Sequence, residues 1–390
     1  MRNIRRKLLS SPAQEAAGVP PGMNISRRQL ICSAPVLAAS MPLLTACSPG
    51  VEPETYAAAA ERIWRGSTPI GIESPALARE LVRCATLAPS SHNTQCWKFA
   101  IDDKRITILP DLSRRCPAVD PDDHHLFVSL GCAAENLVQS ALAYGLHAEP
   151  SFEAGINAIH VSLAPTAARA TPLFKAIASR QSTRGDYDGT AISTDELALL
   201  ERAANSEGVR MLLLTDRPSI ERVLAYVIQA NTAQMADAAF VKELRIWIRF
   251  NGAEAARTGD GLYSAASGNP TVPTWLGDLA FRWVFTAAGE NDKYARQVRS
   301  SAGIAVFIGK AADKTHWVEV GRAYERFALQ ATALGIRNAF LNQPVEVATV
   351  RPQFASALGY AGQRPDLVVR FGRGKALPPS LRRPVQDVMA

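Results

Sequence analysis

The stretch Leu87-Ala88-Pro89-Ser90-Ser91-His92-Asn93-Thr94-Gln95-Cys96-Trp97-Lys98-Phe99 separates two segments of different periodicity. Apolar residues recur at helical spacing over 77–87, and residues 97–101 alternate as a strand does. Pro89 ends the helix, because its ring disfavours the α conformation of the residue before it. Residues 90–94 are able to hydrogen-bond their local backbone. An ordinary helix-to-strand connection fits this pattern, and so does a loop that presents N–H groups and hydroxyls to a flat polar ligand.

Further periodic segments outline a mixture of helices and strands. A strand pair is predicted at 97–101 and 105–109, joined by the turn residues 102–104. Long apolar stripes at helical spacing predict helices from Leu126 to Leu142 and over 318–334. Strands are expected at 157–163, 301–308 and 367–371.

The charge of the chain is concentrated near its start. The formal net charge is +7, and the residues before Cys47 carry six basic side chains against one acid, a net +5. Subtraction leaves +2 for the remainder, which is too little for a phosphate-binding surface. Nucleic-acid binding is therefore not expected.

The N-terminal segment has the features of an export signal. Arg27 and Arg28 precede an uncharged apolar run over 31–46, which two prolines break and which is short for a membrane span. Paired arginines before such a run match a twin-arginine signal. The sequence Leu44-Thr45-Ala46-Cys47 looks like a lipoprotein cleavage box with Cys47 as the lipidated residue. We expect an export signal at 1–46, a tether at 47–72 and a lipid-anchored periplasmic protein; a buried N-terminal helix is the alternative.

The remaining cysteines and the paired histidines carry no metal-ligand spacing. Cys84, Cys96, Cys116 and Cys132 include no C-x-x-C pair, so buried free thiols are expected, although an oxidising compartment permits a disulfide. His124-His125 has no partner at ligand spacing, which favours a surface or helix-entry role. No metal site is predicted.

A second polar motif, Arg180-Gln181-Ser182-Thr183-Arg184, follows a short helical segment at 172–178. Two arginines and a hydroxyl within five residues suit a phosphate beside an electron-rich ring edge, since a guanidinium donates in a planar fork. Taken alone, an arginine-rich solvated turn is the commoner meaning of such a run.

Together the two motifs resemble those of the nitroreductase-fold FMN flavoproteins. The flavin-contacting loop of that family usually reads APSSxNxQPW. Pro89, Ser90, Ser91 and Asn93 match it, whereas Cys96 replaces the usual proline and makes the exit of the loop less rigid. The family signature Arg-x-Ser-x-Arg is matched by Arg180, Ser182 and Arg184.

The resemblance implies roles for these residues around bound FMN. Asn93 and the Ser90-Ser91 backbone would hydrogen-bond the ring. Arg184 would be the catalytic residue, because at the pyrimidine edge it would stabilise the anionic reduced ring. Arg180 would hold the phosphate.

Two later segments resemble parts of the same family. Residues 335–344 stand where family members approach the ring with main-chain groups, which makes Leu341, Asn342 and Gln343 candidates. The basic run 378–385 resembles the segment that reaches the phosphate, so Arg382 or Arg383 would join Arg180 there. A frayed basic tail is the alternative.

The order of the motifs is reversed relative to ordinary nitroreductases. In those dimers the arginine motif precedes the loop, and the loop of one subunit covers the flavin of the other. The reversed order resembles the Acg-type subgroup, in which one chain looks like two nitroreductase halves folded against each other. We therefore expect an α+β fold, a monomer with an internal pseudo-dimer, and halves at 73–165 and 166–390. One FMN site would be intact and the other decayed.

A segment rich in glycine and proline, residues 251–274, is expected to be a lid. Loops of this length are commonly lids or disordered connections, and in the Acg-type subgroup a lid covers the flavin. Trp247, Trp275 and Trp283 flank the segment and would pin it to the core.

The function expected from the resemblance is that of an exported FMN-dependent oxidoreductase. It would pass electrons from a reduced donor to a small planar acceptor such as a nitroaromatic or quinone. A non-catalytic flavin-sequestering protein with a closed lid is the rival, because nicotinamide donors are not expected outside the cytoplasmic membrane. A colourless ligand-binding lipoprotein is a third interpretation.

Overall fold

The computed structural model describes residues 54–390, apart from the side chains of Arg282 and Val284. The predicted export signal and Cys47 lie outside the described residues. Of the predicted tether, Tyr56–Ile63 is a helix, α1, which the Thr55 hydroxyl caps by accepting from the N–H of Ala58.

The first sheet has four antiparallel strands in the order β1-β2-β4-β3. The predicted strand pair forms, and each strand is one residue longer at its C-terminal end, with Trp97 opposite Pro110 and Asp102 opposite Arg105. The strands are β1 (Trp97–Asp102), β2 (Arg105–Pro110), β3 (Leu146–Glu153) and β4 (Ala158–Pro165). The sequence analysis did not identify β3, an edge strand with Pro150 within it.

The second sheet is also antiparallel, in the order β5-β8-β10-β9. Its strands are β5 (Val209–Leu214), β8 (Gly303–Gly309), β9 (Arg337–Phe340) and β10 (Pro365–Gly372). The central strands β8 and β10 are buried along their whole length, which explains the continuous apolar sequence of β8; β10 is apolar apart from the buried Asp366 and Arg370. A parallel pair of two-residue strands, β6 (Ile248–Arg249) and β7 (Leu262–Tyr263), stands apart from both sheets.

Helices and short 3₁₀ turns cover the sheets. The first half and its exit contain α2 (Pro75–Thr86), η1 (Ser91–Asn93), η2 (Leu112–Arg114), α3 (His124–Ala143) and α4 (Pro172–Ala176). Before β8 come α5 (Thr194–Ala204), α6 (Arg217–Ala236), α7 (Ala238–Trp247), α8 (Gly252–Thr258), η3 (Ala265–Ser267), α9 (Thr274–Val284) and α10 (Ala287–Arg299). After β8 come α11 (Lys314–Ala333), α12 (Gln343–Glu346), α13 (Arg351–Ala357) and η4 (Val385–Val388).

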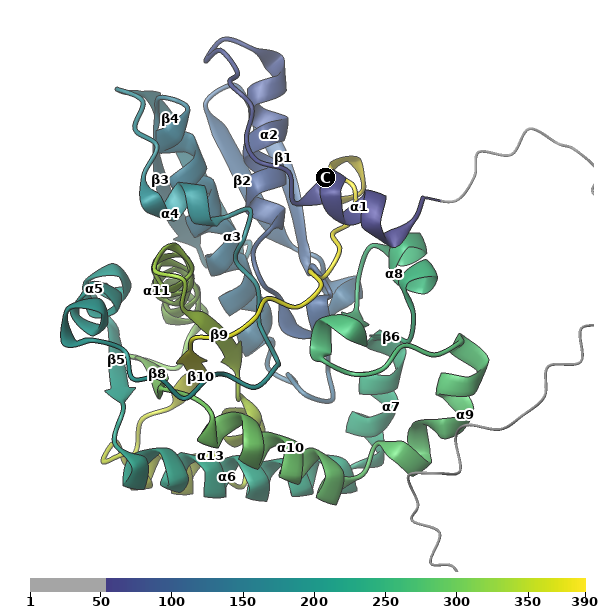
Figure 1. The fold of residues 1–390 in the computed structure, drawn as a ribbon. Coiled ribbons are helices and arrows are strands. Elements are labelled where there is room, and N and C mark those ends of the chain that lie inside the picture. Colours follow the sequence, from purple (N-terminus) through teal and green to yellow (C-terminus); the bar gives the residue numbers. More distant parts are fainter. Residues whose placement is uncertain (1–53) are drawn as a thin grey trace, which may run out of the picture. The chain divides into compact units, whose positions relative to one another are not determined.

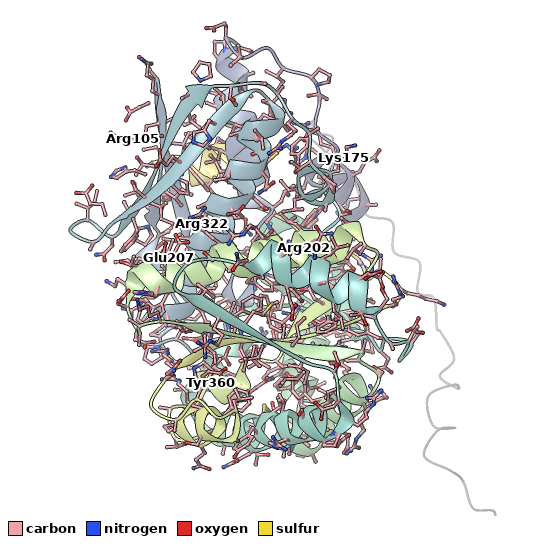
Figure 2. All side chains as sticks on the ribbon, turned by 90° about the vertical axis from the view of Figure 1, so that its left-hand side faces the viewer. Arg105, Lys175, Arg202, Glu207, Arg322 and Tyr360 are labelled. Carbon is pink, nitrogen blue, oxygen red and sulfur yellow. The ribbon has the colours of Figure 1, made fainter. Side chains whose placement is uncertain are left out.

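The two halves share one strand topology. Numbered within its own half, each sheet runs 1-2-4-3, and in each half a 20-residue helix joins the second strand to the third. These two helices, α3 and α11, lie between the sheets (Figure 1). Helices α6, α10 and α13 contribute to a separate apolar cluster on the far face of the second sheet. In the side view of Figure 2, Arg322 of α11 lies between the halves, 3.3 Å from Glu135 of α3.

Helices α3 and α11 meet through a reciprocal pair of glycines. A Cβ added to Gly131 of α3 would collide with the Val318 carbonyl of α11. A Cβ added to Gly321 of α11 would collide with the Val128 carbonyl of α3. Each helix therefore presents the same Val-x-x-Gly spacing to the other, which is the relation that a two-fold axis produces.

Helix α3 also has the length and hydropathy of a membrane span. However, 78% of its apolar window is buried inside the protein. This burial identifies α3 as a core helix of the part of the chain that the structure describes.

Of the surface or helix-entry role predicted for His124 and His125, helix entry is confirmed, since α3 begins at His124. Both side chains are buried, and His124 pairs with Asp366 of β10 at 2.9 Å. Trp275 and Trp283 do not anchor the lid, since they are 69% and 83% exposed on α9. The other face of α9 packs closely against Phe250, where a Cβ on Gly277 would collide with the ring.

Candidate functional site

The loop of residues 89–95, here called the pocket loop, has an unusual backbone. His92, Asn93 and Gln95 have φ values of 48°, 54° and 54°, in the left-handed region that non-glycine residues seldom occupy. The loop is stabilised locally, since the Ser90 hydroxyl accepts from the N–H of Gln95 at 2.9 Å. Such conformations persist only where the surrounding structure holds them, and they cluster at functional sites.

The arginine motif is fixed by the second sheet. The N–H of Thr183 donates to the Asn338 carbonyl of β9 at 2.8 Å. The buried Arg370 guanidinium of β10 donates to the carbonyls of Thr183 at 3.1 Å and Gly185 at 2.8 Å. The segment therefore has a defined path and is not a solvated turn.

A pocket lies between the pocket loop and the arginine motif. Its lining comes from the end of α1, the pocket loop, the arginine motif, the lid segment, β9 and the C-terminal run: Trp64, Pro89, Ser90, Asn93, Arg180, Gln181, Ser182, Arg184, Leu262, Ala266, Phe340, Pro378, Ser380 and Arg382.

Arg180 is buried at the pocket with incomplete partners. Its Nη2 donates to the Leu87 carbonyl at 3.0 Å, and its Nε lies 3.2 Å from a Glu325 oxygen. Nη1 has no hydrogen-bond partner among the described residues. Burial raises the pKa of Glu325 to about 7, and the nearby Arg180 opposes that rise. Near neutral pH, Glu325 therefore compensates Arg180 only in part.

Arg184 lines the same pocket. Among the described residues, its guanidinium makes no ion pair and no side-chain hydrogen bond. Burial lowers its pKa. The backbone of this residue is nevertheless fixed, because its carbonyl accepts from Gln297 at 2.5 Å. Arg184 is thus a positioned charge with no counter-ion within the part of the chain that the structure describes.

Arg382 is buried and its donors are already engaged. Its guanidinium donates to the carbonyls of Thr86, Leu87 and Ala88 at the end of α2 and to Asn93 Oδ1 at 2.8–3.1 Å. Its pKa is lowered to about 9 by burial and by repulsion from Arg180. Arg382 caps the carboxyl end of α2. It contributes a positive charge to the pocket, but its N–H groups are already engaged by the protein.

The pocket therefore carries an excess of positive charge, which favours the binding of an anion. Arg180, Arg184 and Arg382 contribute three positive charges, while the pKa of Glu325, the carboxyl that lies beside Arg180, is raised to about 7. A phosphate monoester carries about −1.5 to −2 charges at pH 7 and would offset this excess. The unpartnered Arg180 Nη1 supplies a donor for such a group.

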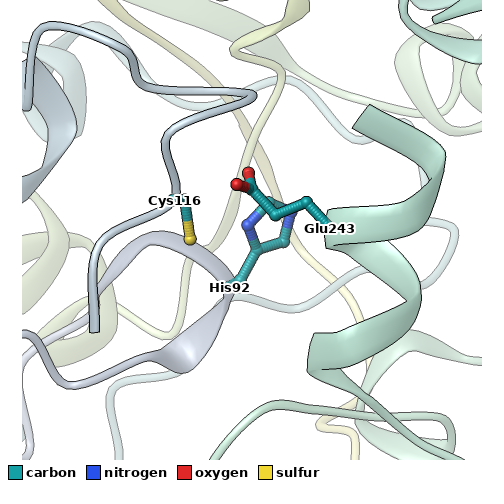
Figure 3. A group of neighbouring side chains, drawn as sticks. All are labelled: His92, Cys116 and Glu243. Carbon is teal, nitrogen blue, oxygen red and sulfur yellow. The ribbon is translucent and has the colours of Figure 1, made fainter. Parts of the chain in front are cut away.

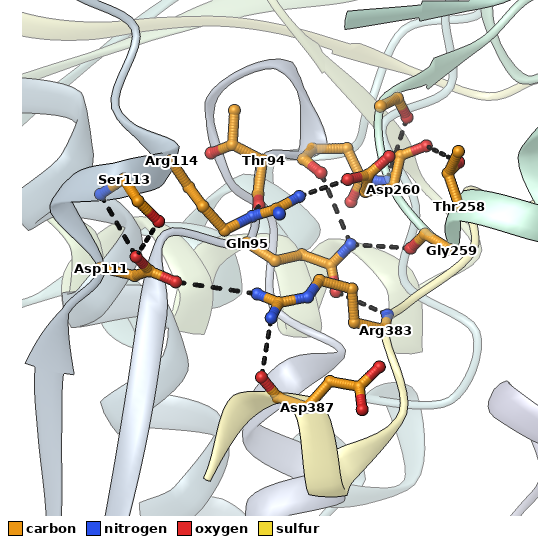
Figure 4. A network of polar contacts seen from close by, with 12 residues as sticks. Thr94, Gln95, Asp111, Ser113, Arg114, Thr258, Gly259, Asp260, Arg383 and Asp387 are labelled. Atoms are coloured by element: carbon orange, nitrogen blue, oxygen red, sulfur yellow. Dashed lines mark hydrogen bonds and ion pairs between the residues drawn. The ribbon is translucent and has the colours of Figure 1, made fainter. Parts of the chain in front are cut away.

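A network of polar contacts joins the pocket loop to the lid segment (Figure 4). The Gln95 amide donates to the Gly259 carbonyl at 2.8 Å and accepts from the N–H of Arg383 at 2.8 Å. Asp260 forms ion pairs with Arg114 and with Arg249, the latter at 2.7 Å. The lid segment is thus tied down over the pocket loop in this structure.

The structure brings some predicted site residues together and leaves others outside. Pro89, Ser90, Asn93, Arg180, Ser182, Arg184 and Arg382 line the pocket, whereas Ser91, Leu341, Asn342, Gln343 and Arg383 do not. Arg383 points toward Asp111 and the Asp387 carbonyl instead. The Asn342 side chain accepts from the N–H of Val368. The assignments of the second group stay predictions.

Sequence reasoning missed the residues that support the site. Glu325 was detectable in principle as a charged residue within the apolar stripe of the 318–334 helix, and it is fully buried. The amide of Asn93 was expected to face the ligand, but it donates to the Gly261 and Leu381 carbonyls. No local pattern indicates Arg370, because its acceptors lie far away in the chain.

Comparisons with known proteins identify relatives of this chain by sequence. No protein-family model matches the chain. Over 325 residues it is 26% identical to "Putative NAD(P)H nitroreductase Rv3131" of Mycobacterium tuberculosis strain H37Rv, covering 80% of this chain and 90% of the relative. The same figures hold for "Putative NAD(P)H nitroreductase MT3217" of strain CDC 1551. The chain is thus a homologue of proteins named as nitroreductases.

Solved structures similar to part of the chain include two nitroreductases. One is the FMN-dependent nitroreductase NfnB from Mycobacterium smegmatis in complex with NADPH, with a TM-score of 0.36 and 12% identity over 52% of this chain and 88% of that one. The other is a nitroreductase with bound FMN from Desulfitobacterium hafniense, with a TM-score of 0.36 and 18% identity over 56% and 96%.

Proposed function

We propose that this protein is an FMN-dependent oxidoreductase of the nitroreductase type. It would pass electrons from a reduced donor to a small planar acceptor such as a nitroaromatic or quinone. The observation that carries the proposal is the electropositive pocket between the pocket loop and Arg180–Arg184. The homologues named as nitroreductases support it.

The residues of the pocket suggest how FMN would be held. Arg180, with its free Nη1, and the charge of Arg382 would retain the phosphate. Arg184, which has no counter-ion, would stabilise negative charge on the ring. Bound FMN supplies the electron-transfer chemistry itself. The role of Asn93 is to position the loop, because Arg382 and two carbonyls already occupy its amide.

The proposal is tested by isolating the protein and counting its flavin. We expect a yellow protein with one FMN per chain, bleached by NADPH and reoxidised by a nitroaromatic. A chain that retains no flavin after expression, and takes up none when FMN is added, would contradict the proposal.

A second candidate function is favoured by the contacts across the lid segment. Gln95 and Asp260 hold that segment against the pocket loop, which would restrict access to a bound flavin. The chain would then bind and sequester FMN without turnover. A flavin that stays oxidised with NADPH but is bleached by dithionite would support sequestration over catalysis.

We also propose that the protein is exported by the twin-arginine route and anchored in the membrane through a lipid on Cys47. The support is the sequence alone, Arg27-Arg28 before an uncharged run that ends at Cys47. The Cys47→Ala variant should lose incorporation of labelled fatty acid, whereas Cys84→Ala should retain it. Equal labelling of the two variants would reject the anchor. We further propose a monomer, which size-exclusion chromatography of the delipidated protein would test.

A further inference from the structure

Three potential metal ligands converge behind the pocket loop. A ring nitrogen of His92, the Cys116 sulfur and a carboxylate oxygen of Glu243 lie within 4.8 Å of one another. They come from the pocket loop, from the segment after η2 and from α7 (Figure 3). Because the three segments are distant in sequence, these residues form no metal-binding motif that the sequence alone could indicate.

The geometry leaves a gap between these atoms. His92 Nδ1 is buried and has no hydrogen-bond partner among the described residues, so neither Cys116 nor Glu243 satisfies it. In Figure 3 a ring nitrogen of His92 faces the sulfur and the carboxylate. Zinc bond lengths of about 2.0–2.3 Å place tetrahedral ligand atoms about 3.5 Å apart. Small side-chain rotations would therefore bring the three groups onto one ion.

Two of the three groups are already positioned. The Glu243 oxygens accept from the N–H groups of Ala118 at 2.8 Å and Val119 at 3.1 Å, which fixes the carboxylate beside the Cys116 segment. Each oxygen keeps a further lone pair for an ion. Cys116 is a buried free thiol that packs in an apolar cluster with Val119, Phe240 and Leu244. These apolar neighbours would limit the access of water.

The third group belongs to the strained part of the pocket loop. His92 has a left-handed φ of 48°, so its imidazole projects from a backbone that the neighbouring structure must hold. A ligand shared with α7 would help to hold it. It would also tie α7 to the loop that lines the pocket.

We propose that His92, Cys116 and Glu243 form a binding site for a divalent d-block cation, with Zn²⁺ as the best match. Mixed nitrogen, sulfur and oxygen ligands in tetrahedral arrangement are typical of zinc, and water would complete the coordination. Binding would release the thiol proton to solvent, because the thiolate is the ligand. The site is separate from the proposed flavin chemistry, and its occupancy is measurable without turnover.

The test uses the full-length, flavin-loaded protein after dialysis against a chelator. Zn²⁺ is titrated by calorimetry, and Co²⁺ is added as a spectroscopic probe. We expect one ion per chain, a rise of the thermal midpoint with Zn²⁺, and a thiolate-to-Co²⁺ charge-transfer band in the difference spectrum. Cys116→Ala should abolish this band and weaken Zn²⁺ binding at least about tenfold, the loss of one ligand at 1.4 kcal/mol or more.

Matched variants separate the proposal from its alternatives. Cys84→Ala, which removes another buried thiol, should bind Zn²⁺ as the unmodified chain does. Should Cys116→Ala fail to fold by circular dichroism, His92→Ala, which removes a partly exposed ligand, decides the question. An unchanged Zn²⁺ affinity in Cys116→Ala or His92→Ala would indicate an adventitious ion only, and absence of micromolar binding to the unmodified chain would equally overturn the site.

Discussion

Replacing Arg184 by alanine should weaken FMN binding without weakening the fold. The Arg184 guanidinium lines the pocket and, among the described residues, makes no ion pair or side-chain hydrogen bond. Its removal therefore breaks no polar side-chain contact within residues 54–390. A charge-assisted hydrogen bond to a flavin contributes about 1.5–3 kcal/mol, which corresponds to roughly a ten- to 150-fold rise in the dissociation constant.

Arg382 provides the contrasting variant. Its guanidinium donates to the carbonyls of Thr86, Leu87 and Ala88 and to Asn93, so Arg382→Ala leaves buried acceptors without donors. Each such group costs about 1–3 kcal/mol when it is orphaned. We expect Arg382→Ala to lower the urea midpoint of the flavin-free protein, and Arg184→Ala to leave that midpoint unchanged.

The assay is equilibrium titration of flavin-free protein with FMN, followed by flavin fluorescence. The urea midpoints of the flavin-free variants are measured in parallel by circular dichroism. The reasoning fails if Arg184→Ala binds FMN within twofold of the unmodified protein. It also fails if Arg184→Ala destabilises the flavin-free chain as much as Arg382→Ala does.

Three further predictions concern the helix crossing, the buried counter-ion and the lid. Gly131→Ala or Gly321→Ala should each destabilise the fold by about 1–3 kcal/mol, whereas Gly155→Ala, which meets nothing within 4 Å, should be nearly neutral in urea denaturation. Because the folded-state pKa of Glu325 is raised to about 7, its contribution to stability should fall as the pH rises from about 4.5 to 7. The thermal midpoint of the unmodified chain minus that of Glu325→Gln should therefore be larger at pH 5 than at pH 8, and the opposite sign would refute the assignment. Asp260→Asn weakens two ion pairs of the lid segment and should speed FMN release about tenfold, measured by dilution into a flavin scavenger; an unchanged rate would mean that the lid does not control release.

Sequence reasoning succeeded where the signal was local. The alternation at 97–101, the stop at Pro89 and the apolar stripe of α3 each depend on neighbouring residues, and the corresponding elements form. Six residues singled out in the two motifs line the pocket, as does Arg382 of the C-terminal run, whereas their roles toward a ligand stay predictions. Sequence reasoning failed where the hydrogen-bond partners of a residue are distant in sequence. Arg370 of β10, which positions the arginine motif, is an example. The sequence analysis placed His124 at a helix entry, as the structure does, but gave no sign of the pairing of this residue with Asp366 far along the chain.

The lid and Glu243 come from one insertion into the second half. In the first half the first two strands of the sheet are joined by Asp103 and Lys104 alone. In the second half the corresponding strands, β5 and β8, are separated by residues 215–302, which contain α6 to α10. This insertion contacts the pocket loop through Gln95–Gly259, and through Glu243 it contacts Ala118 and Val119 in the segment after η2. The second half thus supplies both the arginine motif and the cover of the pocket.

The shared strand order also gives a reason why one flavin site would be expected in this chain and not two equivalent ones. The pocket loop belongs to the ten residues, 87–96, between α2 and the first strand of the first sheet. At the equivalent place in the second half, only the four residues 205–208 connect α5 to β5. A link this short has no room for a loop that lines a pocket. If the halves arose by duplication, the second site was lost when this connection shortened, while the insertion after β5 closed over the site that was kept.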